Sequence, residues 1–309
     1  MTKQTLTSLA FIAGTLLLPA CSENEVTVVN LTPGNVPIEV TAANATLTRV
    51  TADNKWEAAD RIAILMMKPD GTPAYTSPAS YTYKPRMEAE APNGFEPVDK
   101  ANTAYYPKLP DKVQFGAWYP ADAEVTVDAN TISVGVPHVY DLLIATTTAA
   151  YDEKNTKVSL QFKHAMVKME VTVNVRDGLT DQVKLEGAKL KIYGPESGAI
   201  WNLATGTVSP DGTMGNFNAD VVATTEGANT VYKATTLVYP TAANTPLTFT
   251  LTDGNNKKFE TGAVQNVTLE AGKINTFAMT LSPKVEVAFT GSIDAWENKT
   301  LGDITGDQQ

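Results

Sequence analysis

Residues 168–175, KMEVTVNV, carry the clearest fold signal in this sequence. Met169, Val171, Val173 and Val175 alternate with polar residues, so all four lie on one face of an extended chain. An amphipathic helix would instead need apolar residues three and four positions apart. The segment therefore predicts a β-strand with one face in a hydrophobic core and the other in water.

Short runs of the same kind recur along the chain, bounded by Gly, Pro, Asn and Asp. RIAILM at 61–66 is the most apolar and is typical of a central strand. Other strands are expected at 26–29, 37–40, 113–118, 125–127, 131–134, 183–185, 188–193, 247–251, 264–269, 274–281 and 285–289. We find no amphipathic helix of three turns after residue 21. Closely spaced strands without helices predict an antiparallel β-sandwich architecture.

The length of 309 residues is enough for two ordinary domains. A long alternating strand ends in the turn signal Arg176-Asp177-Gly178, which is the expected boundary. It divides the chain into an N-terminal β-sandwich at 50–177 and a C-terminal one at 178–309. Pro- and Asn-rich stretches at 72–80 and 91–97 are expected to form surface loops.

Composition argues against several classes of function. Acidic residues outnumber basic ones by 34 to 24, the formal net charge is −10, and we find no basic stripe, so no nucleic-acid partner is expected. One cysteine and two histidines exclude an intramolecular disulfide framework and argue against a Cys/His zinc site. The hydrolase elbow, phosphate loop and dinucleotide fingerprint are missing. We expect no enzyme, no cofactor and no metal, and we interpret His164 as a structural residue.

The N-terminus has the features of an export signal. Lys3 precedes a mostly apolar run, Leu6 to Leu18, which is shorter than the roughly 20 residues that span a bilayer. Leu18-Pro19-Ala20-Cys21 resembles the lipobox of bacterial lipoproteins. The resemblance implies a signal peptide at 1–20 and acylation of Cys21, which would anchor the chain to the outer membrane. The alternative is a buried cysteine that follows Ala20 by coincidence.

Three further segments resemble, in order, the fimbrillin-like lipoproteins, the subunits of type V pili in Bacteroidales. They are WEAADRIAI at 56–64, QFGAWYP at 114–120, and DLLIA at 141–145 followed by LQFKHA at 160–165. With the lipobox, the resemblance covers essentially the whole chain. It implies two transthyretin-like antiparallel β-sandwich domains in tandem, and a structural or adhesive pilus subunit of the cell surface.

The same resemblance implies a route of maturation. A trypsin-like protease removes an N-terminal pro-segment together with its lipid, and a strand from another subunit fills the groove that the lost strand leaves. Arg49 is the expected processing site, because it lies in a polar stretch before the first strong strand. Lys55 and Arg61 are alternatives, of which Arg61 is the poorer because it opens an apolar strand. The pro-segment would then be residues 21–49.

Val285, Val287 and Phe289 share one face of a strand and form the candidate donor segment. The alternative is that this strand is simply the last strand of the chain's own C-terminal domain. The expected partners are other pilus subunits in a homo- or heteropolymer, the outer membrane through the lipid on Cys21, and a ligand on a host or bacterial surface. A rival hypothesis is a surface lipoprotein that binds glycans or matrix and does not polymerise.

Overall fold

The computed structural model describes residues 33–44, 56–70, 72–75, 80–88, 93–107, 112–123, 125–128, 131–134, 141–150, 156–202, 205–282 and 286–293. Within these residues the chain is all-β, and its helices are two short 3-10 turns, η1 (Lys100–Asn102) and η2 (Thr180–Gln182). The all-β prediction is therefore confirmed. In this part of the chain, no helix has the length and apolar character that crossing a membrane requires.

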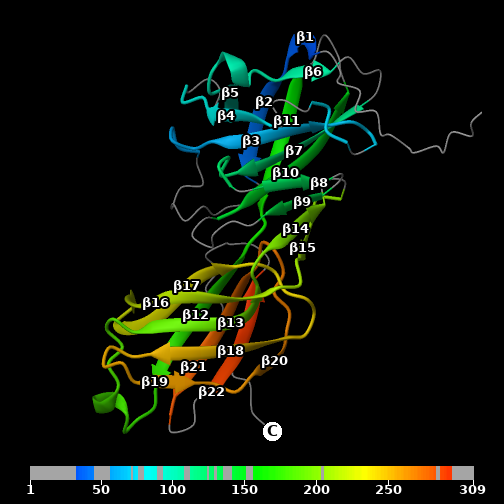
Figure 1. Ribbon diagram of the computed structural model, residues 1–309. Helices are drawn as coiled ribbons and strands as arrows, with labels where there is room; N and C mark the ends of the chain where they lie inside the picture. Colours follow the sequence, from blue (N-terminus) through cyan, green and yellow to red (C-terminus); the bar gives the residue numbers. More distant parts are fainter. Residues whose placement is uncertain are drawn as a thin grey trace, which may run out of the picture. The chain divides into compact units, whose positions relative to one another are not determined.

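Seven strands close into a barrel in the order β10-β11-β2-β5-β4-β3-β7 (Figure 1). They are β2 (Glu39–Asn44), β3 (Ile62–Met67), β4 (Tyr81–Pro85), β5 (Gly94–Pro97), β7 (Lys112–Tyr119), β10 (Leu143–Ala150) and β11 (Lys157–His164). Neighbouring strands are antiparallel, except that β2 and β11 run parallel. A separate pair consists of β1 (Pro33–Pro37) and β6 (Tyr105–Pro107).

Side chains fill the barrel. β3, which includes most of the predicted central strand, is buried along its whole length. β11 alternates strictly and buries Val158, Leu160 and Phe162 while the residues between them are exposed. Tyr83, Tyr106 and other aromatic residues complete this core. The alternation follows from the period of two in a strand, since only one face of each strand can point into a closed barrel.

A second sheet of nine strands contains the alternating segment at 168–175. Its order is β19-β18-β13-β16-β17-β12-β21-β22, with β20 paired to β18. The strands are β12 (Val167–Val175), β13 (Lys189–Glu196), β16 (Met214–Glu226), β17 (Asn229–Val238), β18 (Thr245–Thr252), β19 (Lys258–Glu260), β20 (Val264–Val267), β21 (Ile274–Leu281) and β22 (Glu286–Ile293). β12 is central, and its residues Met169, Val171 and Val173 are buried as predicted.

The pairing of β12 bears on the predicted domain boundary, which stays a prediction. A boundary at Arg176-Asp177-Gly178 would group β12 with the earlier strands, whereas β12 pairs with β17 and with β21. β12 thus lies in the same sheet as the later strands, and the change of sheet occurs between β11 and β12. A turn after a strand shows where the strand ends, not which strands it pairs with.

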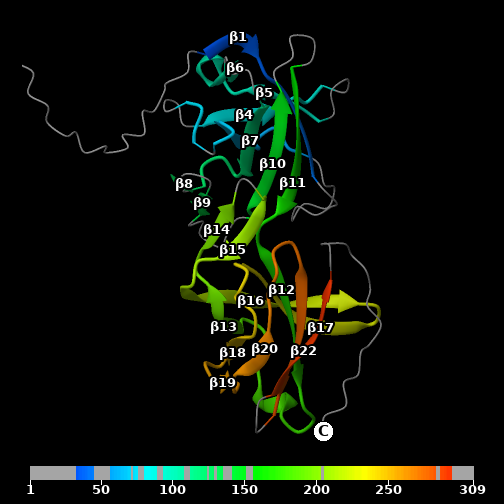
Figure 2. The ribbon, with the colours of Figure 1, turned by 90° about the vertical axis from the view of Figure 1, so that its right-hand side faces the viewer.

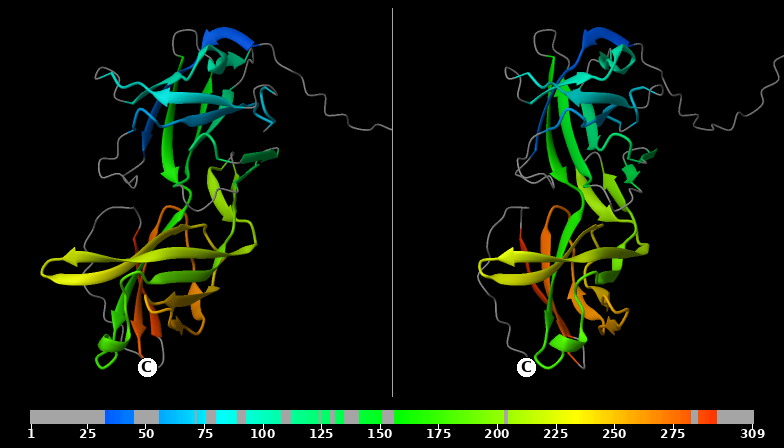
Figure 3. Two further views of the ribbon diagram at one scale, coloured as in Figure 1. Left: turned by 60° about the vertical axis from the view of Figure 1, so that its left-hand side comes forward. Right: turned by 90° about the vertical axis from the view of Figure 1, so that its left-hand side faces the viewer.

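A small sheet of four strands has the order β15-β14-β9-β8. It consists of β8 (Val125–Asp128), β9 (Thr131–Val134), β14 (Ala199–Asn202) and β15 (Thr207–Pro210). The predicted hairpin of β8 and β9 is confirmed, with Asp128 opposite Thr131. The β16–β17 hairpin is longer and extends beyond its neighbours in Figure 3, because its outer pairs bond only to each other.

The expectation of surface loops at 72–80 and 91–97 is wrong for part of each stretch. β5 lies inside the second stretch, and its Phe95 is only 2% exposed. Ala74 and Tyr75 of the first stretch are also buried. Pro97 is compatible with β5 because it is the last residue of the strand, where the missing N–H interrupts little of the ladder. The aromatic residues between the turn formers were the better guide to burial.

We predict that the protein loses stability above pH 10 because of the tyrosines in the barrel. Burial raises the pKa of Tyr83 to about 12, and it also raises the pKa of Tyr75, Tyr81 and Tyr106. The unfolded chain therefore ionises first, near the ordinary tyrosine pKa of about 10, and the free energy of unfolding falls as the pH rises from there toward 12. Urea unfolding at pH 9 and pH 11 measures the loss. Equal stability at both values would contradict the prediction.

Candidate functional site

The candidate site is the slot in the barrel that β2 occupies. β2 pairs in parallel with β11, from Glu39 opposite Lys157 to Asn44 opposite Phe162. On its other edge it pairs with β5, where Val40 faces Phe95. β11 is in turn paired with β10, and Figure 2 shows these two strands side by side. β2 thus joins two strands that would otherwise both be edge strands of an open sheet.

Ile38, just before β2, and two residues of β2 itself are buried in the core of the barrel. Ile38 is 5% exposed, Val40 3% and Ala42 0%, while Glu39 between them is exposed. The backbone just before β2 is also hydrogen-bonded, because the N–H of Ile38 donates to the Ala104 carbonyl at 3.0 Å. Burial of a large apolar side chain contributes about 1.5–3 kcal/mol. β2 is therefore an integral part of the core, although it precedes the first strong strand of the sequence.

Trp56 closes one end of the slot. Its indole N–H donates to the carbonyl of Ala42 at 3.2 Å, and the N–H of Ala42 donates to the Asn93 carbonyl at 2.9 Å. Trp56 and Asn93, the two partners of the Ala42 backbone, both lie outside β5, which begins at Gly94. Trp56 therefore supplies the donor that a longer β5 would have supplied from its backbone.

Aromatic neighbours hold the Trp56 ring in place. Its ring centroid is 5.2 Å from that of Phe95, 5.4 Å from that of Phe162 and 5.6 Å from that of Tyr119, all in edge-to-face geometry. Such pairs contribute about 0.5–1.5 kcal/mol each beyond the area that they bury. The ring therefore has little freedom to move away from the slot.

The turn that follows Trp56 is fixed by Asp60, which is 5% exposed. Its carboxylate accepts a hydrogen bond from the Glu57 N–H at 2.6 Å and another from the Tyr119 hydroxyl at 3.0 Å. The spacing from Trp56 to Asp60 thus positions the indole against the slot. These residues are part of the WEAADRIAI segment, in which no local pattern indicates that Trp56 contacts the upstream strand.

β1 extends the contacts of the same N-terminal segment. It pairs with β6, with Pro33 opposite Pro107 and Pro37 opposite Tyr105. Gly34 comes so close to this strand that a Cβ there would lie 2.3 Å from the Tyr106 carbonyl oxygen. Only glycine fits such an approach. Residues 33–44 are therefore held by two pairings, that of β1 with β6 and that of β2 with β5 and β11.

The residues predicted for lipidation and processing are placed as follows. Cys21, Arg49 and Lys55 lie outside the described residues, and so does the strand expected at 26–29. Arg61 is described: its guanidinium donates to the carbonyls of Ala58 at 2.8 Å and Asp60 at 2.6 Å, directly before β3. Arg61 thus bonds to the backbone of the turn that follows Trp56, and its use as a cleavage site stays a prediction.

The candidate donor strand is the last strand of the nine-stranded sheet. β22 pairs antiparallel with β21, with Val287 opposite Met279 and Phe289 opposite Phe277. Val287 packs against the core of this sheet, Val285 lies outside the described residues, and the Phe289 side chain is not among those described. Among described strands, β21 is the only one that pairs with β22. Within the described residues β22 is thus an edge strand, and its donation to another subunit stays a prediction.

His164 forms a buried pair with Asp141. Both carboxylate oxygens lie within 2.9 Å of its Nδ1, and both side chains are 9% exposed. The pair joins the end of β11 to the residues before β10, which supports the structural interpretation of His164.

We predict that His164→Ala lowers the free energy of unfolding by about 1–3 kcal/mol, because it deprives a buried carboxylate of a hydrogen bond. Urea unfolding followed by circular dichroism measures the change. Gln161→Ala, at an exposed position of the same strand, is the matched control. A variant as stable as the parent would show that the pair contributes nothing to the fold.

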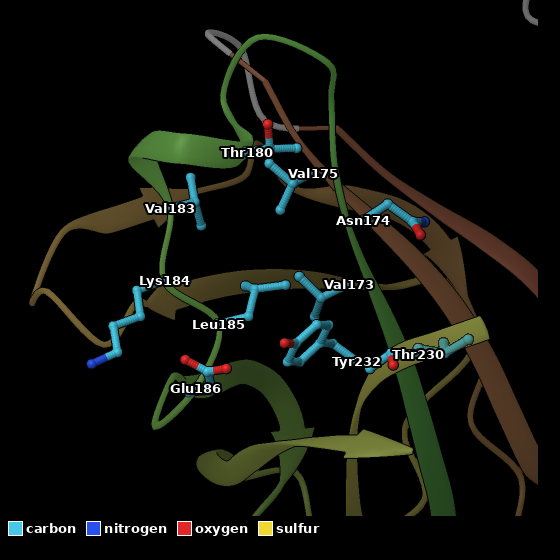
Figure 4. Close-up of a pocket in the computed structure, with 11 residues that line it drawn as sticks. Val173, Asn174, Val175, Thr180, Val183, Lys184, Leu185, Glu186, Thr230 and Tyr232 are labelled. Carbon is cyan, nitrogen blue, oxygen red and sulfur yellow. The ribbon is translucent and has the colours of Figure 1, made fainter. Parts of the chain in front are cut away.

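A cavity of about 530 Å³ lies where β12 and β17 separate (Figure 4). The two strands pair as far as Val173 and Tyr232, and the chain around η2 covers the gap beyond. Val173, Leu185 and Tyr232 lie close together, and Lys184 points away from them. The described lining contains no histidine, cysteine or serine. In the described part of the chain, no three His, Cys, Asp or Glu residues are grouped to hold a metal ion.

Comparison with known proteins shows which protein family the chain resembles. A family model described as fimbrillin-like matches residues 48–296. A candidate fimbrium subunit of Bacteroides uniformis, Fim1C, is 30% identical over 324 aligned residues that cover all of both chains. The crystal structure of a candidate cell adhesion protein from Bacteroides uniformis matches with a TM-score of 0.59 and 27% identity, covering 84% of this chain and 97% of that one.

A crystal structure from Bacteroides ovatus, also of a candidate cell adhesion protein, matches with a TM-score of 0.57, covering 85% of this chain and 99% of that one. At 16% identity it shows a common fold. The family model spans the barrel from β3 onward together with the whole nine-stranded sheet. The resemblance first seen in three sequence segments is therefore confirmed, and the chain belongs to the fimbrillin-like family.

Proposed function

We propose that this protein is an adhesive, non-enzymatic pilus subunit of the cell surface that assembles by strand exchange. The observation that carries the proposal is the position of β2. It lies upstream of the candidate processing residue Arg49, yet it completes the barrel between β5 and β11. The names of its relatives, a fimbrium subunit and a cell adhesion protein, support the surface location and the adhesive role.

Removal of β2 would open the barrel at a defined place. It would leave unpaired backbone groups on β5 and β11, and it would bare the apolar residues that β2 covers, among them Phe95 and Leu160. Exposed edges of this kind take up extended segments of other chains. Each added backbone hydrogen bond contributes about 0.5–1.5 kcal/mol net. The slot is preformed, so the ordering cost falls mainly on the incoming strand.

The proposed life history begins with a lipoprotein precursor. The signal peptide at 1–20 directs export, and acyl chains such as palmitate on Cys21 hold the precursor in the outer membrane. Cleavage after Arg49 then releases the segment 21–49, β1 and β2 included, together with the lipid. The subunit joins a fimbrium with other copies or with related subunits. Val285, Val287 and Phe289 remain the proposed donor residues.

We also propose that the chain folds as two transthyretin-like domains. The strands up to β11 would form the first domain, and the strands from β12 onward the second. The change of sheet between β11 and β12 supports this division at about residue 165. It revises the expected boundary of 50–177 and 178–309 by one strand.

Electron microscopy tests the proposal on cells that express the protein with an epitope inserted at the exposed turn Gly227-Ala228. We expect label along filaments, and the labelled protein to begin after Arg49 in N-terminal sequencing. Cys21→Ser is expected to abolish membrane attachment of the precursor. Label confined to the membrane, on protein that still begins at Cys21, would overturn the proposal and favour a surface binding protein that does not polymerise.

A further inference from the structure

Two acidic residues lie where the chain passes between the nine-stranded sheet and the four-stranded sheet. Glu196 is the last residue of β13, which leads into β14, and Asp211 lies in the connection from β15 to β16. A hydrogen bond of 2.6 Å, from the Ser197 N–H to the Thr213 carbonyl, joins these two passages. The two acids therefore belong to neighbouring segments of the backbone.

Glu196 is a buried acid whose carboxylate is only partly satisfied. The residue is 4% exposed, and among the described residues its Oε2 has no hydrogen-bond partner. The backbone N–H groups of Gly212 and Ala242 donate to the carboxylate. In the described part of the chain, no lysine or arginine forms an ion pair with Glu196 or Asp211. A buried carboxylate oxygen without a partner costs free energy, so this one calls for a ligand.

Asp211 adds to this cost because it has the same charge. Burial raises the pKa of the Glu196 carboxyl, and the nearby Asp211 carboxylate raises it further. Two carboxylates that repel each other are stabilised either when one of them takes up a proton or when both bind a cation. Asp211 is exposed, so a cation can reach the pair from solvent.

The donor atoms indicate which cation the pair would hold. Both side chains offer oxygen only, and no third acidic residue, histidine or cysteine joins them in the part of the chain that the structure describes. Backbone carbonyls and water must therefore supply the other ligands. Ca²⁺ accepts roughly six to eight oxygen ligands in flexible geometry, whereas Mg²⁺ demands a strict octahedron and Zn²⁺ favours nitrogen and sulfur. An irregular set of oxygens fits Ca²⁺ best.

We propose that Glu196 and Asp211 bind a calcium ion that links the β13–β14 passage to the β15–β16 passage. The inference goes beyond the proposed function and does not depend on strand exchange. Both residues follow residue 49, so they stay with the subunit after the proposed cleavage. With only two protein carboxylates, the dissociation constant should lie in the range of extracellular calcium modules, about 0.1–1 mM.

Isothermal titration calorimetry of the protein with CaCl₂ tests the site directly. We expect one binding event in the parent, and a loss of affinity of at least tenfold in Glu196→Gln and in Asp211→Asn. Asp220→Asn is the matched control, because Asp220 is an exposed carboxylate of β16 that pairs with Lys189 and not with Glu196. It should bind calcium as the parent does. Asp211→Asn alters an exposed residue, so it keeps the test valid even if Glu196→Gln fails to fold.

Thermal unfolding gives a second measurement. About 10 mM CaCl₂, compared with a chelator, should raise the unfolding temperature of the parent and of Asp220→Asn by about 3–10 °C. The same treatment should leave Asp211→Asn unchanged. MgCl₂ at the same concentration should give a clearly smaller shift, and an equal shift would overturn the assignment to calcium.

Two results would overturn the site itself. Calcium binding that persists in both Glu196→Gln and Asp211→Asn would place the ion elsewhere in the molecule. Absence of binding to the parent would mean that the pair is stabilised by a proton instead. In that case Glu196→Gln, which has the shape of the protonated acid, should be at least as stable as the parent at pH 8.

Discussion

Arg49→Ala is expected to abolish filaments and to leave the protein on the cell surface with its lipid. The strand that fills the barrel slot lies upstream of residue 49, and its inward residues Ile38, Val40 and Ala42 are at most 5% exposed. While the peptide bond after Arg49 is intact, this segment remains covalently attached to its own slot. An intramolecular strand competes with any external one at a high effective concentration. The uncleaved subunit should therefore be unable to accept a partner.

N-terminal sequencing and electron microscopy of the same cells measure both consequences. Lys55→Ala is the matched control, because cleavage at either residue removes β2 but keeps Trp56. Arg61→Ala is a second control: it removes the hydrogen bonds to Ala58 and Asp60, so it should weaken the Trp56 turn without blocking processing. Filaments of Arg49→Ala protein that begins at residue 56 would move the site to Lys55. Filaments of protein that begins at Cys21 would contradict processing itself.

The sequence was informative where a strand has one buried face with large side chains. β12 alternates between apolar and polar residues, and β3 is apolar throughout, so their patterns identify them directly. β16 was not predicted. Its buried positions include Gly215 and Ala219, and its exposed ones hold Asn216, Asn218 and other residues that are rare in strands. β16 is held by its long pairing with β13 and β17, and the local sequence of a strand does not show which strands it pairs with.

The candidate site was predictable only in part. The sequence predicted the upstream strand at 37–40, which lies in β2 and just before it, and it also supplied Arg49 as the proposed processing residue. The position of that strand between β5 and β11 could not be predicted from the sequence, because its parallel partner lies more than a hundred residues away. The closing role of Trp56 was missed for a similar reason. A tryptophan followed by Asp60 is visible in the sequence, but its hydrogen bond to Ala42 depends on closure of the barrel.

Trp56→Ala is expected to lower the free energy of unfolding of the uncleaved chain by about 3–5 kcal/mol, the usual cost of removing a buried tryptophan side chain. Trp56 is 9% exposed and contacts the rings of Phe95, Tyr119 and Phe162, so its loss leaves a cavity among three aromatic rings. It also leaves the carbonyl of Ala42 without its indole donor. Urea unfolding followed by far-ultraviolet circular dichroism measures the change.

Trp56→Phe separates the two contributions. A phenyl ring keeps most of the contact with the aromatic neighbours but has no N–H, so the loss should be smaller than for alanine and should include about 0.5–1.5 kcal/mol for the hydrogen bond to Ala42. Because that bond holds the end of β2, the Phe variant should also release the N-terminal fragment faster once the chain is cut after Arg49. An Ala variant within 1 kcal/mol of the parent would mean that the ring is not needed to hold the barrel closed. In that case β2 would be retained by its pairing with β5 and β11 alone.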